Sequence, residues 1–156
     1  ASCWLPVQAA ELKIGYVNLA KVFDNYEKTK VSDAALEKSG KQKEGELETK
    51  MNELKKLRQN LELLNDESRE AKQREIEEKS EELQRFRTST ARDLRRDRDK
   101  VAKEILAEIQ RGVDEYAKAN AFSLIIDERF LLYGQSTYDV TDAILKLLNG
   151  RAAAAH

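Results

Sequence analysis

The fold follows from residues 47–68, which read LETKMNELKKLRQNLELLNDES. An apolar residue recurs there at every third or fourth position, and these residues are Leu47, Met51, Leu54, Leu57, Leu61 and Leu64. This spacing is the a/d signature of a narrow coiled-coil seam. The next four residues, 65–68, are turn formers, and Asp66 or Ser68 can cap a new helix. The stretch therefore predicts a helix that ends near residue 65 and needs a facing partner.

A second apolar seam, beyond the turn, supplies that partner. It consists of Ile76, Leu83, Phe86, Leu94, Val101, Ile105, Ile109, Val113 and Tyr116. The two seams predict an antiparallel helical hairpin, or arm, over residues 32–119, with its tip near residues 65–68. Residues that face each other across such a hairpin have numbers that add up to about 130.

Charge supports this register. Residues 85–100 contain seven basic and three acidic residues, which gives a net charge of +4. The facing part of the first helix carries Asp33, Glu37, Glu44 and Glu46, together with Lys38, Lys41 and Lys43. Each exposed pair contributes only a few tenths of a kcal/mol, so the pairing favours the register without holding the hairpin together.

The flanks of the arm read as a small sheet. Residues 13–17, 123–127 and 130–134 are short apolar runs typical of strands, and residues 127–129 form a polar turn between the last two. The predicted core of this sheet consists of Ile14, Tyr16, Val17, Leu124, Ile125, Ile126, Leu131 and Leu132. So small a sheet has open edges, and self-association would cover them.

A last helix completes this part of the chain. Asp139 is placed to cap it, its apolar stripe includes Ile144, and Gly150 is expected to end it. Residues 11–31 and 120–149 are therefore expected to form a β-rich body. The predicted fold class is α+β, mainly α, with the long hairpin arm growing from this body.

Composition excludes most enzyme classes. Charged residues make up 37% of the chain, yet the formal net charge is −1, which argues against a globally basic nucleic-acid binder. The single cysteine, Cys3, and the single histidine, His156, lie at opposite ends, so neither a His/Cys zinc pattern nor a Cys–His catalytic pair is expected. We expect no catalytic residues, no metal and no cofactor. No run approaches the roughly 20 apolar residues of a membrane span.

The two ends of the chain are read separately from the fold. Residues 1–10 look like the end of a secretory signal, with Val7 and Ala9 placed for cleavage before Ala10. Cys3 is then a remnant of that signal; the alternative is an acylated lipoprotein cysteine. Residues 150–156 read as a tail that leads from a cloning scar into a histidine tag.

The terminal motifs resemble the Skp/OmpH family of periplasmic chaperones. The resemblance rests on KIGYVNLAKVF at 13–23, SLIID at 123–127 and DVTDAILKLLN at 139–149, with the charged hairpin between them. It implies a homotrimer in which a β-rich body carries three hairpin arms around a cavity. It also implies an ATP-independent holdase in the periplasm that binds unfolded outer-membrane proteins and prevents their aggregation. Some members are described as binding lipopolysaccharide through basic arm residues.

Two other function classes remain open from the residues. A prefoldin-like or purely structural coiled-coil subunit fits the composition equally well, although the terminal motifs and the signal remnant favour the chaperone. A nucleic-acid binder that uses residues 85–100 as a basic helix is disfavoured, because Asp93, Asp97 and Asp99 interrupt the run. An enzyme is the least favoured class.

The candidate contact residues for clients or anions lie on the second helix of the arm. They are Arg85, Arg87, Arg92, Arg95, Arg96, Arg98 and Phe86. The arginines are candidates from charge alone, and the competing interpretation is a solvated helix face paired with acids. For Phe86 the competing interpretation is a seam residue that faces Leu47. Asp127 is interpreted as a turn residue at the end of a strand and not as a catalytic acid.

Overall fold

The computed structural model describes residues 11–154. The predicted signal remnant, with Cys3, and the last residues of the predicted tail lie outside the described residues. In chain order the elements are β1 (Ile14–Val17), α1 (Leu19–Asn25), α2 (Glu27–Leu61), α3 (Asp66–Ala119), β2 (Leu124–Asp127), η1 (Glu128–Phe130), η2 (Ser136–Tyr138) and α4 (Thr141–Ala154). Two long helices dominate and the sheet has two strands, which confirms the predicted fold class.

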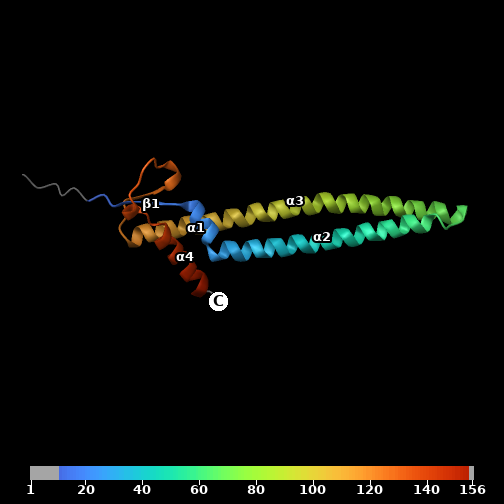
Figure 1. Cartoon of the computed structure of the whole chain (residues 1–156), viewed down its shortest axis with the longest axis horizontal. Coiled ribbons are helices and arrows are strands. Elements are labelled where there is room, and N and C mark those ends of the chain that lie inside the picture. The colour runs from blue at the N-terminus through green and yellow to red at the C-terminus, as the bar shows by residue number, and fades with distance from the viewer. Residues whose placement is uncertain (1–10, 155–156) are drawn as a thin grey trace, which may run out of the picture. The chain divides into compact units, whose positions relative to one another are not determined.

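The chain divides into two compact units, one of residues 31–102 and one of residues 11–30 with 103–154. In the first unit α2 and α3 run side by side as a hairpin (Figure 1). Leu54 and Ile76, whose numbers add up to 130, are both buried there. The ammonium of Lys50 reaches Glu82 across the two helices at 2.6 Å. These observations confirm the hairpin and its antiparallel pairing.

The tip of the hairpin lies at residues 62–65, slightly before the expected residues 65–68. Helix α2 ends at Leu61 and α3 begins at Asp66. The cap differs in detail, because the side-chain oxygen of Asn65 accepts a hydrogen bond from the Ser68 amide at 3.1 Å. Asn65 therefore satisfies a first-turn amide of α3, in place of the predicted Asp66 or Ser68.

The second unit holds the sheet. Strands β1 and β2 are parallel, with Ile14 opposite Leu124 and Val17 opposite Asp127. Helices α1 and α4 pack against each other in this unit. Its most deeply buried side chains are Val22, Ile105, Ile109, Thr141 and Ile144. The core therefore combines residues from both ends of the chain.

The predicted third strand at residues 130–134 is wrong. The carboxylate of Asp127 accepts a hydrogen bond from the Arg129 amide at 3.0 Å, and residues 128–130 form the 3₁₀ turn η1. After this turn the backbone does not run back along β2, and residues 131–135 form no strand. Leu132 in this segment is fully exposed. Within one chain, a strand here would have no layer to pack against.

The last helix starts as predicted and ends later. Asp139 accepts a hydrogen bond from the Thr141 amide at 2.9 Å, and α4 runs past Gly150 to Ala154. The alanines that follow Gly150 favour the helix, so the glycine does not stop it. Within residues 11–154, no helix is both long and apolar enough to cross a membrane.

Candidate functional site

The arginine run of α3 is only partly paired. Arg85 forms an ion pair with Glu81 at 3.2 Å, and Arg96 pairs with Asp93 at 3.1 Å. Both partners belong to the same helix, so these pairs do not form the predicted bridges to the facing helix. Four further arginines of the run form no ion pair within the described part of the chain: Arg87, Arg92, Arg95 and Arg98. All of them lie exposed on α3.

Phe86 is half-buried between the two helices of the hairpin. The ammonium groups of Lys43 and Lys50 each lie 5.5 Å from the centre of its ring. Leu47 lies between these two lysines on α2. Phe86 therefore faces the helical turn that contains Leu47, as expected for a seam residue. The ring still keeps part of its surface in water. A half-covered aromatic ring beneath two cations is a cation–π arrangement.

The cations around Phe86 are neutralised by carboxylates. Lys43 binds Glu46 at 2.9 Å. Lys50 and Lys79 both bind Glu82, at 2.6 and 3.3 Å. The hydrogen bond from Lys50, followed by the one from Lys79, lowers the pKa of Glu82, and Lys43 lowers the pKa of Glu46. Each of these lysines therefore has a carboxylate partner, and Glu82 serves two of them.

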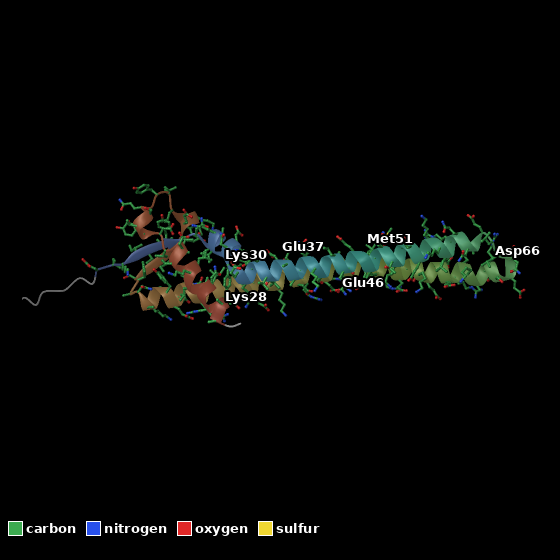
Figure 2. The ribbon with its side chains drawn as sticks, turned by 60° about the horizontal axis from the view of Figure 1, so that its bottom comes forward. Lys28, Lys30, Glu37, Glu46, Met51 and Asp66 are labelled. Atoms are coloured by element: carbon green, nitrogen blue, oxygen red, sulfur yellow. The ribbon has the colours of Figure 1, made fainter. Side chains whose placement is uncertain are left out.

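A groove between α2 and α3 combines apolar and basic side chains. It is a groove of about 610 Å³, which we call the Met51 groove. Its apolar residues are Met51, Leu54 and Leu83, and its basic residues are Lys55, Arg58 and Arg87. Met51 is 44% exposed, and its sulfur accepts a hydrogen bond from the Arg87 guanidinium at 3.2 Å. Figure 2 labels Met51 on α2 between Glu46 and the hairpin tip at Asp66.

Sequence reasoning missed this groove. Of its residues only Arg87 is among the predicted contact residues, because Met51 reads as an ordinary seam position. The available signal was the chain's single methionine beside the basic residues Lys55, Lys56 and Arg58. A flexible, polarisable side chain at the edge of a seam suits a surface that adapts to several partners.

The second unit presents an apolar surface. Of the eight predicted body residues, Tyr16 and Val17 are buried within the chain, Ile125, Ile126 and Leu131 are half-buried, and Ile14, Leu124 and Leu132 are exposed. Three aromatics that were not predicted extend this surface: Phe130, Tyr133 and Tyr138, which are 78%, 81% and 50% exposed. All three belong to the second unit.

Asp127 behaves as the turn residue that was predicted. Its carboxylate accepts hydrogen bonds from the amide of Arg129 and from its guanidinium, the latter at 2.9 and 2.6 Å. The guanidinium lowers the pKa of this carboxyl. The carboxylate is thus fully engaged by one neighbour. Within residues 11–154, no group of three histidine, cysteine or acidic residues is placed to hold a metal ion.

Comparison with known proteins covers nearly the whole chain. Residues 13–148 match the model of a family described as outer membrane protein (OmpH-like). The fold is similar to the crystal structure of a proposed OmpH-like outer membrane chaperone from Caulobacter crescentus CB15, with a TM-score of 0.82 and 17% sequence identity. That alignment covers 91% of this chain and 86% of the other. No curated protein matches the sequence.

Proposed function

Because the chain belongs to the OmpH-like outer membrane protein family, we propose that it is an ATP-independent holdase chaperone. Its clients are unfolded outer-membrane proteins in transit through the periplasm, where outer membrane chaperones of this family work in general. The arms bind these clients in a cavity between the copies of a trimer and prevent their aggregation.

The observation that carries this proposal is the surface of the hairpin. Apolar side chains such as Phe86 and Met51 are only half covered there, and charged side chains surround them. Each such contact is weak. Many weak contacts along a helix retain an unfolded chain and still release it without an energy source. The abundant charge also keeps the loaded arms soluble.

The apolar surface of the second unit supports the trimer. Leu132, Phe130 and Tyr133 lie exposed beside a sheet of only two strands. A sheet of this size is marginal on its own, and contact with further copies covers both its edges and these side chains. Light scattering tests the assembly, because a trimer has three times the 17.9 kDa mass of the chain.

Anionic lipid, including lipopolysaccharide, is a second proposed partner of the arms. The unpaired Arg92, Arg95 and Arg98 supply the positive charge that phosphate groups need. Binding of this kind weakens as salt rises, because the charges are exposed.

A deletion of the outer arm tests the function. Removing residues 45–61 and 66–85 and keeping the turn at residues 62–65 shortens both helices by similar lengths, because Gly45 and Arg85 face each other across the hairpin. We expect the shortened chain to assemble normally and to lose its ability to keep an unfolded outer-membrane β-barrel protein from aggregating. Turbidity of the diluted client measures this loss. Full protection by the shortened chain would rule out the arms as the binding surface.

A further inference from the structure

The Met51 groove differs from the rest of the hairpin in its charge balance. Lys55, Arg58 and Arg87 line it, and none of the three forms an ion pair within residues 11–154. Arg58 and Arg87 contact neutral groups instead, the Ser80 hydroxyl at 3.4 Å and the Met51 sulfur at 3.2 Å. Around Phe86, by contrast, Lys43 and Lys50 are bound to carboxylates.

One acid, Glu62, also lines the groove, and it too forms no ion pair in the described residues. With three cations against this single carboxylate, the groove carries a net charge of +2. Arginine and lysine that are not neutralised locally attract a carboxylate from outside, and a guanidinium offers it a planar, two-pronged contact.

The floor of the groove is apolar. Leu54 is buried, Leu83 is half-buried, and Met51 is the most accessible of the three. Methionine adapts its shape to different apolar and aromatic side chains. The hollow of about 610 Å³ lies in the range of about 300–1,000 Å³ that is usual for small-molecule sites, which is large enough for a short stretch of peptide.

We propose that the Met51 groove docks extended client segments in which an apolar or aromatic side chain lies next to an aspartate or glutamate. The apolar side chain rests on Met51 and Leu83, and the neighbouring carboxylate meets Arg87, Arg58 or Lys55. This inference rests on the proposed holdase function and adds the chemistry of the segments that the arm selects. Charge complementarity favours acidic segments over basic ones.

Fluorescently labelled peptides test the groove in the full-length protein. The probe contains Phe-Asp pairs separated by serine, and two matched peptides carry Phe-Lys or Ala-Asp pairs in their place. Fluorescence anisotropy measures each dissociation constant at low and at high ionic strength. We expect the Phe-Asp peptide to bind most tightly, and its advantage over the Phe-Lys peptide to shrink as salt rises.

Two triple variants distinguish binding in the groove from general attraction to the positive charge of the hairpin. Lys55→Gln, Arg58→Gln and Arg87→Gln together remove the cations of the groove. Lys38→Gln, Lys56→Gln and Arg69→Gln remove the same charge from exposed positions of the same hairpin outside the groove. We expect the dissociation constant of the Phe-Asp peptide to rise about tenfold in the groove variant and less than about twofold in the control. Circular dichroism checks that both variants keep their helices.

An uncharged change adds a second readout. Met51→Gln keeps the length of the side chain and removes its apolar end, so binding of the Phe-Asp peptide should weaken about threefold. Binding of the Ala-Asp peptide should change little, because that peptide places no large side chain on the floor.

Several outcomes would overturn the groove proposal. They are no peptide binding by the wild-type protein, equal weakening in the two triple variants, and equal affinity for the Phe-Asp and Phe-Lys peptides. Binding to vesicles of anionic phospholipid is the last measurement. A groove variant that loses vesicle binding but keeps peptide binding identifies a lipid site and contradicts the proposal.

The proposed function is judged separately. It fails if the wild-type chain does not suppress aggregation of an unfolded β-barrel client, whatever the peptides do. The groove fails if peptide binding does not distinguish the two variants, even where the wild-type chain holds its client well.

Discussion

The hydroxyl of Tyr26 donates a hydrogen bond to the carboxylate of Glu108 at 3.1 Å, and the Lys28 ammonium binds the same carboxylate. Tyr26 is buried, and Glu108 is half-buried on α3. The contact joins residues far apart in the sequence within the second unit. It places one charged group at the edge of the core of this unit.

Glu108 makes the stability of this unit depend on pH. Partial burial raises the pKa of this carboxyl, but the hydrogen bonds from Lys28 and Tyr26 outweigh it and hold the pKa below its usual 4.5. A carboxyl whose pKa is lowered by folding stabilises the fold above its unfolded pKa, and this stability is lost as pH falls through the folded pKa. We expect the Tm of Glu108→Gln to lie below that of the wild type at neutral pH. The difference should shrink below about pH 4.

Thermal unfolding monitored by circular dichroism at several pH values measures this difference. Glu62→Gln removes an exposed carboxylate that forms no ion pair in the described residues, and it is the matched control. A Tm difference of Glu108→Gln that stays constant from neutral to acid pH would contradict the linkage.

Gly112 permits the close packing of α3 on α4. A Cβ atom at this position would lie 2.6 Å from Cδ2 of Leu148, which is itself buried. We expect Gly112→Ala to lower the stability by about 1–3 kcal/mol, because Leu148 must leave its position in a packed core. Chemical denaturation measures the loss. Gly40→Ala is the control, since a Cβ there meets nothing within 4 Å and alanine favours the helix. Equal effects of the two changes would show that the contact is unimportant.

Ala121 carries backbone strain at the end of α3. Its φ is +56°, and the Phe122 amide donates to the Ala117 carbonyl at 2.9 Å. This is the left-handed helix cap in which glycine is usually found, and a side chain there costs about 1 kcal/mol. We expect Ala121→Gly to stabilise the protein by a few tenths to about 1 kcal/mol, because relief of strain exceeds the added freedom of the unfolded chain. A lower midpoint of chemical denaturation in the variant would show that the left-handed cap is not strained.

Leu132 separates folding from assembly. Its side chain is fully exposed within one chain, so Leu132→Asp should leave the helical content unchanged. In the proposed trimer the same change buries a charge against an apolar surface, which costs several kcal/mol, so the variant should be monomeric at micromolar concentration. Light scattering measures the mass. Leu63→Asp, on an exposed residue near the hairpin tip, is the control and should keep the wild-type mass. A Leu132→Asp variant of unchanged mass would exclude this surface from the interface.

The two helices of the hairpin and the turn between them are encoded locally, so the pattern of residues predicts them. The a/d spacing from Leu47 to Leu61 specifies one helical face, and Asn65 caps the start of the next helix. Short apolar runs likewise located β1 and β2, and Asp139 marked the start of α4. The terminal motifs identified the family. In each case the signal lies within a few residues of the element that it predicts.

Three features depend on how distant parts of the chain pack together. They are the pairing of the two strands, the absence of a strand at residues 130–134, and the Met51 groove. Residues 130–134 have the composition of a strand, but a strand forms only where another strand accepts its hydrogen bonds, and among residues 11–154 none pairs with this segment. Met51 and Arg87 lie 36 positions apart, and their contact depends on how the two helices face each other. The spacing of apolar residues fixes which face of a helix is covered. It does not fix which charged side chains form ion pairs across the two helices. An exposed ion pair contributes less than about 1 kcal/mol, so the choice between two possible partners changes the stability very little.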